Sequence, residues 1–151
     1  MFPLLFKLSD KKLLFIGGGN VAKRKLLSIL NQSSPEVTII SKELHPDIKK
    51  LLSSNKITWI NSSFKEELLK EKYDFAFICT DDKELNTKAA LILKKLGTPV
   101  NICDNKELSD FFMPAVISQD DIIISVSTKG KSPALVKKLK EIISKTLKGL
   151  K

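Results

Sequence analysis

The stretch Leu14-Phe-Ile-Gly-Gly-Gly-Asn-Val-Ala-Lys-Arg-Lys25 places three glycines directly after an apolar run and three cations directly after the glycines. Gly17, Gly19 and Ala22 fit the pattern G-x-G-x-x-G/A. In this pattern the first glycine makes a tight turn, the second lets the backbone approach a pyrophosphate, and the small third residue lets a helix pack closely on a strand. We therefore expect a dinucleotide-binding turn, with the amides at the helix start on the phosphates.

The rest of the first two thirds of the chain alternates apolar runs with helical patterns. Apolar, often β-branched runs predict strands at 12–16, 37–40, 57–60, 75–79 and 100–103. Apolar residues at helical spacing predict helices at 21–30, 47–52 and 83–96. This alternation is typical of an α/β fold, and we expect a Rossmann-type, doubly wound parallel sheet with helices on both faces.

The pattern changes after Asp104. Two extended runs, 111–117 and 121–127, are joined by a short polar link and predict a β-hairpin. Ser132 and Pro133 then supply a helix cap and a first-turn proline, and an apolar stripe follows at Leu135, Leu139, Ile142, Ile143 and Leu147. We expect a nucleotide-binding domain at 1–111 and, at 112–151, a hairpin and helix that form a dimerisation segment, because so apolar a piece needs cover from a second copy.

Composition limits the alternatives. A chain of 151 residues with 42% hydrophobic content can bury one sizeable core. No apolar run approaches the roughly 20 residues of a membrane span, and the first six residues are too short for a signal peptide, so we expect a cytoplasmic protein that does not enter membranes. Cys79 and Cys103 lack a CxxC partner and are expected to be small core residues. One histidine and no cysteine cluster predict no metal site.

The net charge of +9 comes mostly from lysine. A solvated surface and attraction of an acidic small molecule both account for it, whereas nucleic acid is disfavoured because the lysines are dispersed and lack interleaved aromatics. Lys23, Arg24 and Lys25 lie in a helical first turn, where the helix dipole disfavours cations. We expect two of them to point into water and the third to reach cofactor phosphates or an acidic substrate. Gly130-Lys131-Ser132 is not a P-loop, because Ser125 stands where its leading glycine belongs.

Polar residues follow the predicted strands at the edge where doubly wound sheets bind ligands. Thr80 and Asp81 end the fourth strand, and Asn101 and Asp104 lie at the end of the fifth. Asp104 is expected near the nicotinamide as a general base or substrate-orienting group, with a turn cap as the alternative. After the second strand, Glu43 is a candidate ribose partner and Ser41 an alternative, while Lys42 keeps a phosphorylated ribose open.

Six motifs together resemble the precorrin-2 dehydrogenases, a family that includes the bifunctional dehydrogenase and sirohydrochlorin ferrochelatase of sirohaem synthesis. They are Phe2-Pro-Leu-Leu-Phe, Gly17-Gly-Gly-Asn-Val-Ala-x-Arg-Lys25, Thr80-Asp-Asp82, Val100-Asn-Ile-x-Asp104, Phe111-Phe-Met-Pro-Ala115 and Ser127-Thr-x-Gly-x-Ser-Pro133. The resemblance implies an NAD-binding Rossmann domain, a homodimer, and oxidation of the polycarboxylate tetrapyrrole precorrin-2 to sirohydrochlorin.

The resemblance also implies roles for single residues. Asp104 matches the proposed catalytic aspartate of the family, and Asn20, Val21, Lys42 and Glu43 match cofactor-contacting positions. With the residues derived above, the expected NAD site comprises Gly17, Gly19, Asn20, Val21, Ala22, Ser41, Lys42, Glu43, Thr80, Asp81 and Asn101. The expected substrate contacts are Arg24, Ser127, Thr128, Lys131 and Ser132.

Two departures from the family bear on function. Lys129 replaces a usual glycine, and the sequence has one helix after the hairpin where many relatives carry a longer helical extension. The shorter end leads us to expect a dehydrogenase alone, with ferrous iron as a chelatase substrate left open. The alternative from another class is a non-catalytic NAD-sensing module, which shares the glycine turn but has no need for the motif at 127–133.

Overall fold

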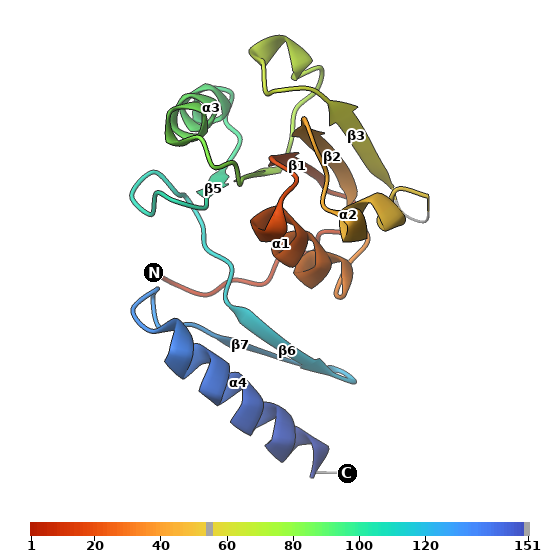
Figure 1. Ribbon diagram of the computed structural model, residues 1–151. Coiled ribbons are helices and arrows are strands. Elements are labelled where there is room, and N and C mark those ends of the chain that lie inside the picture. Colours follow the sequence, from red (N-terminus) through yellow and green to blue (C-terminus); the bar gives the residue numbers. More distant parts are fainter. Residues whose placement is uncertain (54–55, 150–151) are drawn as a thin grey trace. The chain divides into compact units, whose positions relative to one another are not determined.

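The computed structural model of the protein describes residues 1–53 and 56–149. The chain folds into two compact units: Phe6–Phe112, and Met1–Leu5 together with the chain from Met113 onward. Figure 1 labels the helices and strands of both units. Residues 150 and 151 of the predicted segment 112–151 lie outside the described residues.

The large unit is built on a five-stranded sheet in which every pair of neighbouring strands is parallel. Its strands are β1 (Lys12–Ile16), β2 (Glu36–Ser41), β3 (Ile57–Asn61), β4 (Phe75–Ile78) and β5 (Val100–Ile102). The strand order is β3-β2-β1-β4-β5, so the chain winds outward from β1 in one direction and then from β4 in the other. The predicted doubly wound Rossmann-type sheet is confirmed, and its order reverses between β1 and β4, where such sheets bind ligands.

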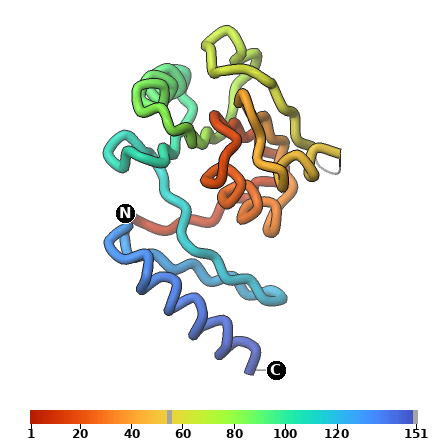
Figure 2. The backbone as a smooth tube through the Cα atoms, viewed as in Figure 1, coloured from red at the N-terminus to blue at the C-terminus, as the bar shows by residue number. Residues whose placement is uncertain are grey.

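Helices cover both faces of this sheet, as the tube in Figure 2 lets the reader follow. They are α1 (Asn20–Leu30), α2 (Pro46–Leu51) and α3 (Lys83–Lys95). Leu14 and Ile16 pack in one cluster with Leu93 of α3. Since strand side chains alternate between faces, Leu13 and Phe15 point to the opposite face, which α1 and α2 cover. A short 3₁₀ turn, η1 (Glu66–Leu68), was not predicted, because three residues carry no periodic signal.

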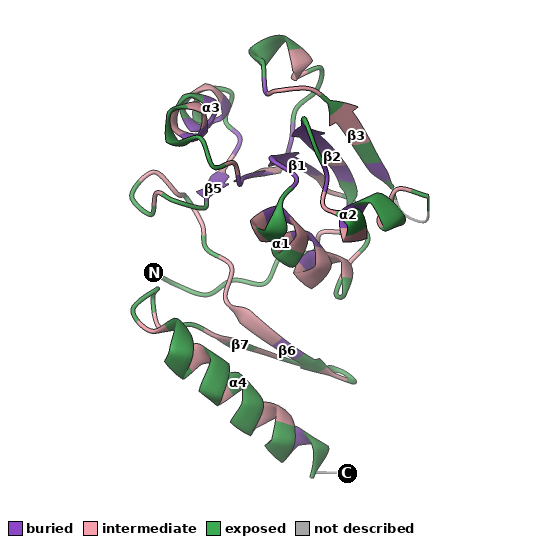
Figure 3. Ribbon diagram, in the orientation of Figure 1, coloured by how far each residue is buried: buried purple, intermediate pink, exposed green. Residues whose placement is uncertain are grey.

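The core of the large unit is the sheet itself. Leu13, Leu14 and Phe15 of β1 are fully buried, and Figure 3 shows much of the central strands in the purple of buried residues. Continuous burial along a strand is expected when helices cover both faces of a parallel sheet. The functional edge is therefore held by a rigid support.

The small unit consists of an antiparallel hairpin and one helix. The hairpin strands are β6 (Ala115–Gln119) and β7 (Ile122–Val126), and the helix is α4 (Pro133–Lys148). Ser132 caps α4 by accepting a hydrogen bond from Leu135 N, and Gln119 Nε2 donates to Leu147 O. The predicted hairpin and helix are confirmed. The first strand begins at Ala115 rather than at Phe111, because Pro114 has no N–H to donate to a ladder.

In the described part of the chain, no helix has the length and apolar content that crossing a membrane requires.

Candidate functional site

The turn after β1 admits only glycine at its first position. Gly17 has φ +100, a conformation that side chains disfavour, and a Cβ there would lie 2.5 Å from Cys79 O. Its N–H donates to Ile40 O at 2.9 Å. The turn is therefore fixed between the ends of β2 and β4, the two strands that flank β1.

The next two glycines differ in what surrounds them. A Cβ on Gly18 would lie 2.4 Å from Glu43 O, whereas a Cβ on Gly19 would meet nothing within 4 Å. Packing within the chain therefore requires Gly18 but leaves open space at Gly19. Gly19 is also the N-cap of α1, and none of the side chains that the structure describes caps this helix. The first amides of a helix have no intrahelical partner, so this exposed end offers donors to an anion such as a pyrophosphate.

A buried hydroxyl lies beside this turn. Ser41 Oγ, at the end of β2, is buried and has no hydrogen-bond partner among the described residues. It would lie 2.7 Å from a Cβ on Gly18. A buried polar atom without a partner is unusual in proteins, and a bound ligand or an ordered water would supply the partner here. The exposed Lys42 and Glu43 follow directly, so the residues present fit the ribose and phosphates of a dinucleotide.

Asn86 of α3 connects the ends of β4 and β5. Its side chain is fully buried, and its Nδ2 donates to Asp104 Oδ2 at 3.1 Å and to Thr80 O at 3.0 Å. Its Oδ1 accepts from Thr80 Oγ1 at 2.6 Å. Two predicted site residues are thus fixed by one amide that the sequence analysis missed.

The turn-cap alternative for Asp104 is wrong. The turn that follows β5 is capped by Asn105, whose Oδ1 accepts from Glu107 N and Leu108 N, both at 3.1 Å. Asp104 is exposed, and its carboxylate is held by Asn86. It is therefore available to a ligand at the carboxyl edge of the sheet, as is the exposed Asp81.

The three cations of α1 have three different surroundings. Lys23 is half-buried, with its Nζ 3.2 Å from His45 Nε2 and 3.6 Å from Asp47 Oδ2. Arg24 is exposed. Lys25 is half-buried and donates to Asn101 Oδ1, and its Nζ lies 5.9 Å from the ring centroid of Phe77. The expectation that two of the three point into water is therefore wrong, since Arg24 alone is exposed.

Lys25 has a signal in the sequence that was overlooked. The buried residues of α1 are Ala22, Leu26 and Ile29, and Lys25 falls on the same stripe, three residues after the first and four before the last. Asn86 likewise falls on the buried stripe of α3, with Ala89, Ala90 and Leu93 three, four and seven residues after it. A polar residue in the apolar stripe of a helix is the feature that could have identified both.

Neither cysteine is suited to nucleophilic chemistry. Cys79 is buried, which raises the pKa of its thiol to about 12. Cys103 is exposed rather than in the core, because β5 ends at Ile102 and residue 103 already belongs to the loop. Partial burial of its sulfur and the neighbouring Asp104 raise the pKa of this thiol as well. Since the thiolate is the reactive form, both remain unreactive thiols near neutral pH.

The predicted substrate residues of the small unit form the turn before α4. Thr128 Oγ1 accepts from Ser132 N at 3.0 Å, and Ser127 Oγ accepts from Lys129 N at 3.1 Å. Lys131 is exposed. Lys129 has φ +55, which explains why glycine suits this position. The hydroxyls of Ser127, Thr128 and Ser132 thus shape the turn, and their contact with a substrate stays a prediction.

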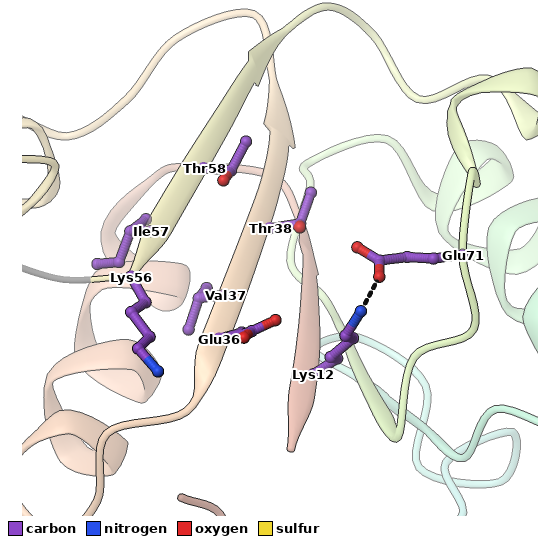
Figure 4. Close-up of a pocket in the computed structure, with 8 residues that line it drawn as sticks. All are labelled: Lys12, Glu36, Val37, Thr38, Lys56, Ile57, Thr58 and Glu71. Atoms are coloured by element: carbon purple, nitrogen blue, oxygen red, sulfur yellow. Dashed lines mark hydrogen bonds and ion pairs between the residues drawn. The ribbon is translucent and has the colours of Figure 1, made fainter. Parts of the chain in front are cut away.

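A pocket of about 340 Å³ lies at the opposite edge of the sheet (Figure 4). It is lined by residues at the amino ends of β1, β2 and β3, and Lys12 and Glu71 form an ion pair at its side. None of the predicted site residues lines it. Ligands of doubly wound sheets bind at the carboxyl ends of the strands, so we assign no role to this pocket. Among the described residues, no group of three or more His, Cys, Asp or Glu side chains could hold a metal ion.

The chain is similar in sequence and in fold to known proteins. Residues 4–115 match the family model described as Putative NAD(P)-binding. The chain belongs to this family. The match spans the glycine turn, the unpartnered Ser41 hydroxyl and the loops that carry Thr80 and Asp104.

Several siroheme synthases are similar to the chain. The chain is 35% identical over 147 residues to that of Psychrobacter arcticus, with 92% of this chain and 25% of that protein covered. It is 29% identical over 140 residues to that of Neisseria meningitidis serogroup C, with 93% and 29% covered. The chain thus spans about a quarter of the length of these relatives.

A solved structure shares the fold. It is described as SirC, precorrin-2 dehydrogenase, and superposes with a TM-score of 0.80 at 24% identity, covering 97% of this chain and 71% of that one. The resemblance drawn from the six motifs is confirmed by these relatives.

Proposed function

We propose that the protein oxidises precorrin-2 to sirohydrochlorin with NAD as the hydride acceptor. One observation carries the proposal: Asn86 holds the Asp104 carboxylate at the strand edge next to the open glycine turn. The names of the relatives, siroheme synthase and precorrin-2 dehydrogenase, give the substrate class. The excess of positive charge supports it, because a polycarboxylate is drawn to a protein of net charge +9.

The residues around the turn would hold NAD. The amides that follow Gly19 would bind the pyrophosphate, and Ser41 and Glu43 would hold the ribose. A carboxylate at this position repels a 2′-phosphate, so we expect NAD to be preferred over NADP. The neighbouring Lys42 attracts a phosphate and should make this preference smaller. Comparable kcat/KM values for the two cofactors would contradict this assignment.

The reaction balances as precorrin-2 plus NAD⁺ giving sirohydrochlorin, NADH and one proton. NAD, when bound, supplies the acceptor for the hydride that leaves a saturated ring carbon. Asp104 either accepts the proton released from the macrocycle or orients the ring for transfer. Asn86 Nδ2 holds that carboxylate by a hydrogen bond, and Thr80 is fixed by the same amide.

The test is Asp104→Asn, which keeps size and removes the charge and the proton acceptor. Turnover followed by NADH absorbance should fall by about 10²-fold or more, the scale of a lost acid–base group. The affinity for NAD should not change. Glu107→Gln removes an exposed carboxylate from the same loop and should leave turnover intact. Full turnover in Asp104→Asn would exclude the proposed role.

A non-catalytic NAD-sensing module is the rival proposal. It shares the glycine turn and the Ser41 hydroxyl but has no use for a carboxylate fixed by a buried amide. Adding NAD and precorrin-2 to the unmodified protein decides between the two. NAD binding without NADH formation would favour the sensor.

The assembly, the second activity and the location complete the proposal. We infer a homodimer formed through the small unit, whose apolar residues Ile123 and Ile142 are exposed. Free thiols at Cys79 and Cys103 are consistent with the reducing cytoplasm.

Ferrous iron is the candidate substrate for a second, chelatase activity. Supplying sirohydrochlorin and Fe²⁺ and following sirohaem tests this, and a shared site would make Asp104→Asn slow both reactions.

A further inference from the structure

Lys25 is a half-buried cation of α1. No carboxylate of the described residues pairs with it, although Lys11, Lys12, Lys23, Lys50 and Lys94 each have an acidic partner. Its contacts are the neutral Asn101 Oδ1 and the face of the Phe77 ring. Removing an ammonium from water is unfavourable unless something compensates its charge. Burial accordingly lowers the pKa of Lys25 from its ordinary value.

Asn101 is fixed and cannot turn away from the lysine. The residue is buried in β5, and its Nδ2 donates to Phe111 O at 2.8 Å. Its Oδ1 is therefore directed at Lys25 Nζ. The amide holds the ammonium in one place but leaves its full charge uncompensated, which is what a binding site for an anion requires.

The Phe77 ring beside this cation belongs to a cluster of aromatic side chains. Phe77 and Phe111 meet edge to face with their centroids 5.4 Å apart, and Phe75 packs against Phe111 at 5.3 Å. Phe75 and Phe111 are half-buried. A positive charge beside an apolar aromatic surface suits a ligand that has both a carboxylate and a large flat ring.

The position of Lys25 relates it to the site already described. It lies on the face of the sheet that α1 covers, because Phe77 points to that face while its neighbours Ala76 and Ile78 belong to the α3 cluster. Asp104 follows Asn101 by three residues along the chain. Phe77 and Asn101 each lie one residue before the carboxyl end of their strand, so the cation lies near the edge at which the proposed reaction would take place.

We propose that Lys25, held by Asn101, binds a carboxylate arm of the substrate and thereby fixes the macrocycle relative to Asp104. This inference rests on the proposed oxidation of precorrin-2 and adds the group that recognises the acidic substituents. It also accounts for an ammonium in the apolar stripe of α1.

The kinetic test compares Lys25→Met, which keeps the length of the side chain and removes the charge, with Lys56→Met. Lys56 is exposed at the opposite edge of the sheet, so this control makes the same change in net charge. A lost charge-assisted hydrogen bond corresponds to a rise in KM for precorrin-2 of about 10-fold or more. kcat and the affinity for NAD should stay within about threefold, and Lys25→Arg should recover part of the KM. An unchanged KM in Lys25→Met would overturn the inference and leave the proposed oxidation standing.

A binding test separates this inference from the proposed function. Sirohydrochlorin and its fully methyl-esterified form are titrated against the unmodified protein and Lys25→Met. The substitution should weaken binding of the free acid and leave binding of the ester unchanged. If the protein makes no NADH but shows this difference, the oxidation is wrong and the carboxylate site stands. If both ligands respond equally to the substitution, Lys25 binds no carboxylate.

Discussion

The two units of the chain differ in how completely they bury their apolar residues. In β1 the exposed fractions of Leu13, Leu14 and Phe15 are 0%, whereas Ile123 of the hairpin and Ile142 of α4 are each 51% exposed. Among the described residues of the small unit, the buried hydrophobic side chains are Ile117 and Leu147. The large unit therefore has a complete core within one chain, and the small unit has a core that needs another surface.

The largest expected effect comes from the core of the large unit. Phe15→Ala removes a fully buried ring that stacks on Phe77 at 4.6 Å between centroids. The free energy of unfolding should fall by about 3–5 kcal/mol, the usual range for such a truncation. Chemical denaturation measures it. Ile142→Ala, at half-exposed α4, should change this transition by less than about 1 kcal/mol. Equal losses in the two variants would remove the contrast between the units.

The glycine turn allows a finer separation of fold from binding. Gly17→Ala places a Cβ against Cys79 O at a positive φ, so it should destabilise the large unit by about 1–3 kcal/mol. Gly19→Ala meets open space and should leave stability unchanged while weakening NAD binding by about 10-fold, since a pyrophosphate must approach there. Thermal unfolding and NAD titration measure the two effects. Loss of stability in Gly19→Ala, with NAD affinity kept, would contradict the assigned roles.

The exposed apolar face of the small unit should be covered by a second copy. Ile142→Lys introduces a charge at that face and should weaken dimerisation by about 10-fold or more, equivalent to about 1.4 kcal/mol. Sedimentation at micromolar concentration measures the assembly, and unfolding of the large unit should be unaffected. Glu141→Ala, at the adjacent exposed position, serves as the control. An unmodified protein that is monomeric and fully active would contradict the dimer.

The smallest effect concerns a carboxylate of the large unit. Burial alone would raise the pKa of Asp110, but hydrogen bonds from Lys94 Nζ and Val100 N more than offset it, and the pKa lies below its ordinary value. A depressed pKa means that Asp110 adds stability above the unfolded pKa of about 3.9, and this stability is lost as the pH falls below that value and through the lower folded pKa. Because Asp110 is half-exposed, the contribution should be below about 1 kcal/mol. Thermal unfolding from pH 7 to pH 3 should show the difference in stability between Asp110→Asn and the unmodified protein becoming smaller as the pH falls. A difference that does not change with pH would contradict a contribution from the ionised Asp110.

Much of the site could be predicted because its residues follow strand ends. The carboxyl ends of parallel strands share one edge of the sheet. The proximity of Gly17, Thr80 and Asp104 could therefore be predicted from the sequence. Asn86 and Lys25 could not, because a lone polar residue in an amphipathic helix has no visible partner until the neighbouring strands are in place. The sequence predicts Ser41 as an alternative to Glu43 for the ribose partner. The burial of its hydroxyl depends on the glycine turn that packs against it, so it is seen only in the structure.

Periodicity and short motifs are local properties of the chain, so the strands, the helices, the glycine turn and the likeness to precorrin-2 dehydrogenases could be predicted from the sequence. What each polar side chain faces became visible only in the folded chain. There the turn cap is Asn105 rather than Asp104, Cys103 lies outside the core, and Lys25 has no acidic partner among the described residues. The physical reason is that hydrogen bonds and desolvation depend on atoms that are distant in sequence, and these meet only when the sheet forms.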